Sequence, residues 1–326
     1  MIWLQNLGKS ELSNNNTIMI DTQKNPRHIP VLLKEITDLC IDSNLHLDCN
    51  LGDAGHIEAL LEANPNVHVH AIDADQEAIK RAQYFLHQNT TIADSVDTRL
   101  TIHNGNFSDM EMLIGDELKG KFTTILFDLG LSTYQLGESN RGFSFKFDEP
   151  LDMRFSTSPI AENSGELNAY DIVNSWSPEN IALILRTYAD EAFAWKIAKA
   201  IETQRSQGEI TTSKQLADLV ESVVHRRGGI HPATKTFQAI RIAVNAELQV
   251  LEKALAQAEI FLAKGGKIIV ISYHSLEDRI VKNVFKKFEE DGKGVRENKK
   301  VILPSDEEIE RNPRSRSAKL RIYTKL

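Results

Sequence analysis

The sequence has few cysteines and no long apolar run, and both shortages restrict the class of protein. Its two cysteines, Cys40 and Cys49, are too few for a disulfide framework and lack the spacing of metal ligands. No apolar stretch approaches the roughly 20 residues that span a bilayer. We therefore expect a cytoplasmic protein in a reducing compartment, with no metal and no membrane segment.

Residues 1–26 also lack the features of a secretion signal. A short apolar start has no basic segment before it and no long apolar core after it, so we expect a loose tail. The full length of 326 residues exceeds that of most single domains, which favours two domains or one domain carrying an insertion. With 41% hydrophobic and 26% charged residues, the composition is that of a globular protein.

The sequence also has no excess of basic residues, since its net charge is −8. The acidity lies in residues 1–130, which hold 19 acids and 9 bases, whereas the remainder holds 27 acids and 29 bases. From Arg311 to the C-terminus there are six bases and no acid. This end is a candidate for phosphate contacts, with a solvated basic tail as the alternative.

Two predicted strands end in residues suited to a nucleoside. The first, residues 45–49, leads into a loop with Gly52 and Gly55 and then a helical pattern, which brings backbone close to a ligand. The second, residues 67–72, ends in Asp73, 21 positions after Gly52, a spacing suited to a ribose. The loop alone is a weak signal, and Asp75 has the alternative role of a helix cap.

Two further predicted strands complete the first half. Residues 100–103 precede Asn106 and Phe107, which suit an adenine ring, and residues 123–127 precede Asp128. An acid at the carboxyl end of a parallel strand faces the ligand crevice, although capping of a loop or helix is an equal alternative for Asp128. Strands alternating with helical patterns predict an α/β, doubly wound, mostly parallel sheet.

The alternation then stops, which predicts an inserted, mainly helical domain over residues 136–232. Ser177-Pro178 has the pattern of a helix start, and Thr212 with Gln215 that of a capping box. We expect the sheet domain to comprise residues 27–135 and 233–326. Within it we predict one long helix over 237–262 ended by Gly265-Gly266, a strand over 267–272, a helix capped by Ser275 and Asp278, and a last strand over 320–325.

Several ordered motifs together resemble the ribosomal RNA small subunit methyltransferase H family from about residue 28 to the C-terminus. They are HIPVLL at 28–33, DLG at 128–130, QL at 135–136, RGFSF at 141–145, PLDMR at 150–154, HPATKTFQA at 231–239 with Arg241 and Asn245, SLEDR at 275–279 and NPRSRSAKL at 312–320.

The resemblance implies a Rossmann-like class I methyltransferase that uses S-adenosylmethionine. It also implies N4-methylation of a decoding-centre cytidine in 16S rRNA, with the small ribosomal subunit as partner. A homodimer is left open. The cofactor residues implied are Ala54, Gly55, His56, Asp73, Phe107, Asp128 and Gln135.

Asp128 is the candidate catalytic residue, contacting the cofactor and accepting an N4 hydrogen. His56 is expected to shape the cofactor loop more than to transfer protons. The candidate RNA contacts are Arg141, Arg154, His231, Arg241, His274, Arg279, Arg314 and Arg316. Salt bridges are the alternative for Arg141, Arg154, Arg241 and Arg279. Capping or packing is the alternative for both histidines.

The chain departs from the family pattern at a few positions. Cys49, Asn50 and Ala54 replace Gly, Thr and Gly, and Ala54 is costly if its φ must be positive. Thr133, Tyr134 and Gly137 replace Ser, Pro and Asp, and Tyr273 replaces Phe. The alternative function is a non-enzymatic RNA-binding or assembly factor whose altered loop has lost the cofactor.

Overall fold

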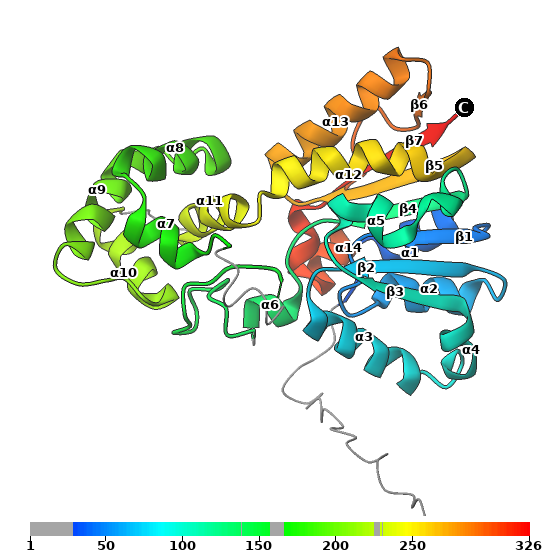
Figure 1. Ribbon diagram of the computed structural model, residues 1–326, viewed down its shortest axis with the longest axis horizontal. Coiled ribbons are helices and arrows are strands. Elements are labelled where there is room, and N and C mark those ends of the chain that lie inside the picture. Colours follow the sequence, from blue (N-terminus) through cyan, green and yellow to red (C-terminus); the bar gives the residue numbers. More distant parts are fainter. Residues whose placement is uncertain (1–28, 138, 157–165, 225–228, 230) are drawn as a thin grey trace, which may run out of the picture.

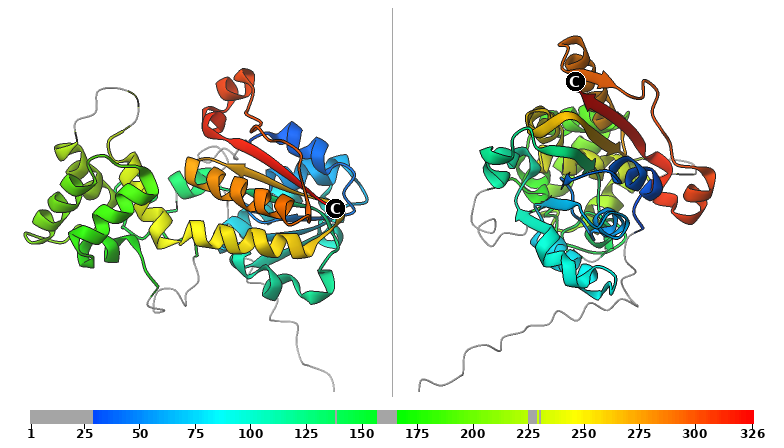
Figure 2. Two further views of the ribbon diagram at one scale, coloured as in Figure 1. Left: turned by 90° about the horizontal axis from the view of Figure 1, so that it is seen from above. Right: turned by 90° about the vertical axis from the view of Figure 1, so that its right-hand side faces the viewer.

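The chain forms a sheet lobe and a helical lobe, which lie side by side (Figures 1 and 2). The computed structural model describes residues 29–137, 139–156, 166–224, 229 and 231–326. The expected tail at 1–26 and the His28 of the first motif lie outside these residues. None of the described helices combines the length and apolar character needed to cross a membrane.

The sheet lobe is built on seven strands in the order β3-β2-β1-β4-β5-β7-β6. They are β1 (Leu45–Asp48), β2 (His68–Asp73), β3 (Leu100–Asn104), β4 (Phe122–Asp128), β5 (Leu262–Ser272), β6 (Gly294–Arg296) and β7 (Lys319–Lys325). β3, β2, β1, β4 and β5 pair in parallel, and β7 is antiparallel to both neighbours. The doubly wound, mostly parallel fold expected of a class I methyltransferase is confirmed, and the order reverses between β1 and β4, where such sheets bind ligands.

Helices cover both faces of the sheet because its central strands are apolar on both sides. In β4, Leu126 packs on one face while Ile125 and Phe127 pack on the other. The first face is covered by α1 (Leu33–Cys40), α2 (Gly55–Ala63), α3 (Gln76–Gln88) and α4 (Ala93–Arg99). The second is covered by α5 (Met110–Ile114), α12 (Glu247–Phe261) and α13 (Ser275–Glu290).

Short elements connect and finish this lobe. They are α6 (Thr133–Gly137), α14 (Asp306–Arg311) and the 3-10 turns η1 (Phe107–Asp109), η2 (Asp116–Leu118) and η3 (Pro313–Ser317). α14 and η3 precede the final strand β7, so the basic C-terminal motif is tied to the sheet.

The helical lobe has a separate apolar core. It contains α7 (Ala169–Ser175), α8 (Pro178–Ala189), α9 (Ala194–Arg205), α10 (Ser213–Val223) and α11 (Thr234–Val244). The predicted helix starts are confirmed, since Ser177 accepts a hydrogen bond from the amide of Asn180, and Thr212 and Gln215 form a reciprocal capping box. Local sequence is sufficient at these caps.

The predicted long helix over 237–262 is wrong, because α11 ends at Val244 and α12 begins at Glu247. Between them, Ala246 adopts φ 47°, in the left-handed region. The Asn245 side chain accepts a hydrogen bond from the amide of Phe155 and donates to the carbonyl of Met153. A distant loop therefore holds the break, which explains why no Gly or Pro marks it.

The helical lobe also extends beyond its predicted end at residue 232. Ala233, Phe237, Ala239 and Ile240 lie in its core, so α11 packs with this lobe. We place the return to the sheet lobe at residues 245–246 instead of 233, because the two cores separate at that break.

Two local predictions in the second half also need correction. Gly265 and Gly266 do not follow the end of a long helix but lie within β5, beside a register shift in its pairing with β4. The capping box of α13 uses His274 and Glu277 instead of Ser275 and Asp278, one position earlier. The Glu277 carboxylate accepts from the His274 amide, and the His274 ring accepts from the Glu277 amide in place of the usual hydroxyl.

Arg141 joins the two lobes through buried polar contacts. Its guanidinium donates to Asp75, the fully buried cap of α3, and to the carbonyls of Arg154 and Phe155. The ion-pair alternative for Arg141 is therefore the one that the structure supports.

We predict that Arg141→Met destabilises the fold by about 3 kcal/mol or more, because the Asp75 carboxylate stays buried without this guanidinium. Lys34→Met is the matched control, since Lys34 and Asp38 are both largely exposed and a solvent-exposed ion pair contributes little to stability. Urea unfolding followed by circular dichroism measures both variants. Equal losses of stability in the two variants would contradict the bridging role.

Candidate active site

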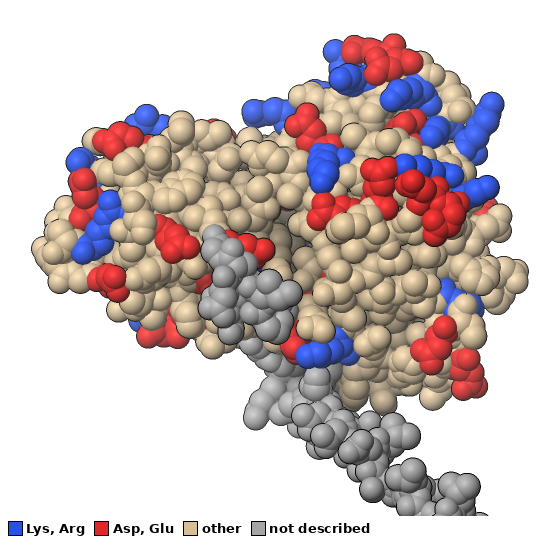
Figure 3. All heavy atoms as spheres, in the orientation of Figure 1, with Lys and Arg blue, Asp and Glu red and all other residues tan. Residues whose placement is uncertain are grey.

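A cavity of about 540 Å³ lies where the two lobes meet, at the carboxyl ends of β1, β2, β4 and β5. Its walls combine the loop after β1, the residues after β4 and β5, and the side of α11. In the space-filling view a crease separates the lobes on this face (Figure 3). The cavity thus lies at the strand-order switch, where doubly wound sheets place ligands.

The loop after β1 enters this cavity with a strained backbone. Gly52 and Ala54 have φ of 51° and 59°, and Ala54 is the residue before α2. A left-handed alanine costs roughly 1–2 kcal/mol, whereas burying its methyl group contributes about 0.8 kcal/mol. The Ala54 methyl is 1% exposed, so packing offsets much of the strain, and the altered loop keeps the expected turn.

Gly55 is required by close packing and not by its φ. A Cβ at this position would lie 2.2 Å from Cγ of Pro30. The next residue, His56, is buried and bonds through Nε2 to the carbonyl of Val31, at 2.9 Å. These contacts fix the start of α2 against the HIPVLL segment, as expected for residues that shape the loop.

Asp73 lies at the end of β2 with both carboxylate oxygens engaged by backbone. It accepts from the amides of Gly52 at 2.9 Å and Asp75 at 2.8 Å. Burial nevertheless raises the pKa of Asp73 to about 7, since these hydrogen bonds offset only part of the desolvation. Burial likewise raises the pKa of Asp48, at the end of β1, to about 6. Of these two carboxylates, Asp73 lines the cavity.

Phe107 and Gln135 both line the cavity, as the sequence predicts. The Phe107 ring packs edge-on against Phe127, with centroids 5.7 Å apart, which leaves it at the cavity wall beside Asn106. The Gln135 side-chain oxygen accepts from the amide of Ser132, and Ser132 Oγ accepts from the amide of Gln135. Gln135 therefore caps the short helix α6 as well as facing the cavity.

The unusual residues Thr133 and Tyr134 both have partners. Thr133 Oγ1 accepts from Arg314 at 2.6 Å. The Tyr134 ring lies under the guanidinium of Arg81, 4.8 Å from the ring centroid, and Arg81 forms a buried bidentate pair with Asp53. The segment after β4 is thus braced against both the C-terminal motif and the loop after β1.

Asp128 ends β4 and projects into the cavity. Its Oδ1 accepts a hydrogen bond from the hydroxyl of Tyr273, at 2.8 Å, and its Oδ2 lies 3.7 Å from Nδ1 of His56. The position directly opposite the cofactor loop favours a site role for Asp128 over a loop cap.

An aromatic group forms the wall on the helical lobe. Phe143, Phe145, Phe155 and Phe237 line the cavity together with Asn245. The rings of Phe143 and Phe155 stack with centroids 5.7 Å apart, and Phe237 packs edge-on against Phe145. Such a wall offers flat apolar surface to a planar ring.

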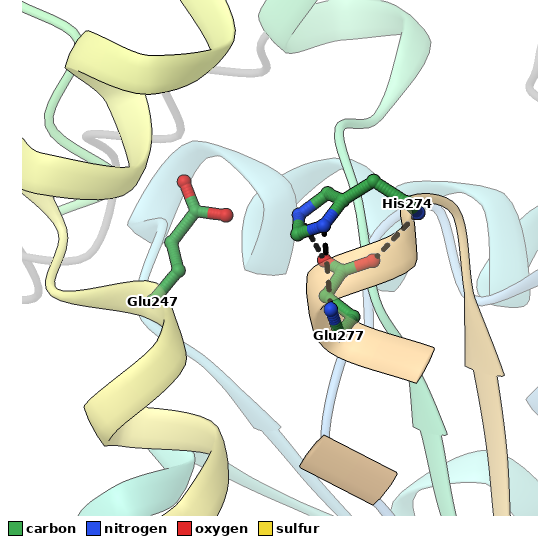
Figure 4. Close-up of side chains that lie close together, drawn as sticks. All are labelled: Glu247, His274 and Glu277. Carbon is green, nitrogen blue, oxygen red and sulfur yellow. Dashed lines mark hydrogen bonds and ion pairs between the residues drawn. The ribbon is translucent and has the colours of Figure 1, made fainter. Parts of the chain in front are cut away.

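Arg241, Glu247, His274 and Glu277 form a polar network along the same cavity. Arg241 binds Glu247 through two hydrogen bonds of 2.7 and 2.9 Å, and the Glu277 carboxylate accepts from the amides of Tyr273 and His274. Glu247, His274 and Glu277 bring potential metal-ligand atoms within 4.8 Å of one another (Figure 4). Glu247 is thus paired with a guanidinium, and Glu277 accepts hydrogen bonds from two backbone amides.

The other predicted RNA contacts fall into two groups, those that line the cavity and those that do not. Arg241 and His274 line the cavity, but the first is in an ion pair and the second caps α13. Arg154 pairs with Asp152, and His231 stacks on Phe145 at 4.3 Å, both outside the cavity lining. Arg154 and Arg241 thus lie in ion pairs, His274 in a helix cap and His231 in a ring stack, while contact of these four residues with RNA stays a prediction.

Phosphate contact remains the prediction for the three exposed arginines. Arg314 lines the cavity mouth, Arg316 follows on the same 3-10 turn, and Arg279 is exposed on α13. Sequence reasoning missed Glu247 and Glu277 as cavity residues and treated Tyr273 only as a departure. The available signal was the spacing of three from His274 to Glu277, which is that of a capping box.

Comparisons with known proteins identify the family of this chain. The model of the MraW methylase family matches residues 25–326. A protein of Coprothermobacter proteolyticus named ribosomal RNA small subunit methyltransferase H is 43% identical over 300 residues, covering 91% of this chain and 96% of that protein. A protein of the same name from Ehrlichia canis is 43% identical over 311 residues, covering 92% and 100%.

A solved structure described as a putative rRNA-methylase from Clostridium thermocellum aligns with 92% of this chain and all of its own, at 12% identity and a TM-score of 0.45. That likeness is too weak to add to the sequence relationship. The family match spans nearly the whole chain, and its motifs meet around one cavity at the expected strand ends. The chain therefore belongs to the MraW methylase family, and it is a methyltransferase.

Proposed function

We propose that this protein transfers a methyl group from S-adenosylmethionine to N4 of a cytidine in the decoding centre of 16S rRNA. The named relatives support ribosomal RNA of the small subunit as the substrate. The observation that carries the proposal is the position of Asp128, whose carboxylate faces a cavity shared by the ribose acid Asp73 and the aromatic wall.

The residues at the β1 and β2 ends fit the cofactor. Asp73 offers a buried carboxylate to the ribose hydroxyls, and Phe107 and Asn106 flank the place for the adenine. The loop from Gly52 to His56, at the start of α2, would hold the methionine part. Within the described chain, buried Asn50 Oδ1 has no hydrogen-bond partner, which is an acceptor left for a bound ligand.

The acceptor chemistry falls to Asp128. Cytosine N4 is a poor nucleophile because its lone pair is delocalised into the ring. S-adenosylmethionine supplies an electrophilic methyl group on a sulfonium. Asp128 accepts an N4 hydrogen, which localises the lone pair on nitrogen, and it takes the proton that N4 loses as the new N–C bond forms.

The aromatic wall supplies a surface for the base itself. A cytosine within a folded RNA must leave its stack to reach Asp128, and stacking on side chains such as Phe143 or Phe237 compensates part of that cost. Arg314, which lines the cavity, and Arg316 on the same 3-10 turn would bind the backbone phosphates beside the base.

We predict that 16S rRNA from cells lacking this protein loses its N4-methylcytidine and regains it when the wild-type gene is restored. Mass spectrometry of nuclease-digested rRNA measures the modified nucleoside. Full retention of the modification in the deleted strain would overturn the proposed reaction.

We predict that Asp128→Asn lowers the single-turnover rate of methyl transfer to small-subunit particles by about 10²-fold or more, the usual loss with a general base. Asp116→Asn, on an exposed turn away from the cavity, is the matched control. If Asp128→Asn keeps full turnover and unchanged cofactor affinity, Asp128 is not the acceptor.

We predict that S-adenosylmethionine binds more tightly as pH rises from 5 to 7 and that its affinity then levels off. The raised pKa of Asp73, about 7, means that the free protein must lose a proton below pH 7 to accept the ribose hydroxyls. Affinity should fall by up to about tenfold per pH unit there, as linkage requires.

Isothermal titration of wild type and Asp73→Asn separates this effect from other titrations. Asp48, whose pKa burial raises to about 6, is present in both proteins. An equal pH dependence in the two proteins would exclude Asp73 as its source.

We predict that charge removal at Arg314 and Arg316 weakens rRNA binding and lowers the slope of log affinity against log salt by about 1.4 to 1.8, as expected for two phosphate contacts. Filter binding of Arg314→Gln/Arg316→Gln measures the slope. Lys119→Gln/Lys121→Gln, at the opposite end of β4, is the matched control. A slope equal to that of wild type would assign these arginines to the solvated surface.

A further inference from the structure

Tyr273 is the first residue after β5, beside the Asp128 end of β4. The pairing of Asp128 with Ile271 places the two strand ends next to each other. The Tyr273 hydroxyl donates to Oδ1 of Asp128 at 2.8 Å. The carboxylate that faces the cavity therefore has one oxygen committed to a neighbouring strand.

The tyrosine is itself held from two sides. Its amide donates to Glu277 Oε2 at 2.8 Å, which ties its backbone to the first turn of α13. Its ring fills the space beside Gly130, where a Cβ would lie 3.0 Å from Cδ2 of the ring. Burial, together with the Asp128 charge, raises the pKa of the Tyr273 hydroxyl well above its ordinary value, so it remains a donor at neutral pH.

The second carboxylate oxygen of Asp128 is in a different setting. His56 Nδ1 lies 3.7 Å from Oδ2, which is beyond hydrogen-bond length. The ring cannot easily move closer, because its Nε2 is bonded to the carbonyl of Val31. Oδ2 consequently retains acceptor capacity toward the cavity.

We propose that Tyr273 is a positioning residue, whose hydroxyl holds Asp128 by Oδ1 and thereby presents Oδ2 to the amino group of the acceptor. This inference rests on the proposed function of Asp128. A carboxylate held at one oxygen cannot rotate freely, so less orientation must be achieved at the moment of transfer. His56 closes the other side of the carboxylate and limits its swing.

Tyr273→Phe isolates the hydroxyl, since the ring that packs on Gly130 and the backbone bond to Glu277 are kept. We expect single-turnover methyl transfer to small-subunit particles to slow about tenfold, within the range for loss of one hydrogen bond to a charged group. Cofactor affinity by titration and the melting temperature should stay at wild-type values. Tyr323→Phe is the matched control, because it removes a buried tyrosine hydroxyl that has no partner among the described residues.

A double-mutant cycle with Asp128→Asn distinguishes positioning from packing. If the hydroxyl acts through the carboxylate, Tyr273→Phe should add little to the loss already caused by Asp128→Asn. Equal slowing in both backgrounds, or a wild-type rate for Tyr273→Phe alone, would overturn the role of Tyr273. The wild-type protein tests the proposed function separately, since its failure to methylate the rRNA would refute both proposals.

Discussion

The site depends on keeping carboxylates at the buried ends of neighbouring parallel strands. Asp48, Asp73 and Asp128 end β1, β2 and β4, and burial opposes the ionised form of the first two. Hydrogen bonds from the loop amides of Gly52, Asp75 and Asn50 offset part of that cost. The shape of the loop after β1 is therefore tied to the electrostatics of the strand ends, and Ala54 keeps that shape at the cost of a left-handed backbone.

A second constraint is the linkage of two separate cores at a single cavity. Asn245 bonds to the loop at Met153 and Phe155, while Arg141 in the same loop region binds Asp75 beside the ribose acid. The aromatic wall and the end of β2 are therefore linked through this loop. Arg141 and Asn245 make their hydrogen bonds within this linkage, whereas Arg314 and Arg316 are exposed near the C-terminus.

Much of this arrangement could be predicted from sequence because its signals are local. The strand ends at Asp73 and Asp128 and the caps at Ser177 and Thr212 follow from periodicity and capping chemistry within a few residues. The break at Ala246 could not be predicted, since it is held by hydrogen bonds to a loop about 90 residues earlier. The pairing of Arg141 with Asp75 could not be predicted either, because an arginine in a sequence motif can bind a phosphate or a carboxylate. Contacts between distant segments decided both cases.

The departures from the family pattern are therefore better understood as a set than one at a time. Ala54 retains the turn, Tyr134 braces Arg81 against the same loop, and Thr133 engages Arg314. Tyr273 adds a donor to the one carboxylate that is proposed to touch the acceptor. Of these four replacements only Tyr273 lines the cavity, and it adds a hydroxyl donor there. The retained turn at Ala54 and the hydrogen bond from Tyr273 to Asp128 leave the cavity walls intact in this chain, in agreement with its membership of a methylase family.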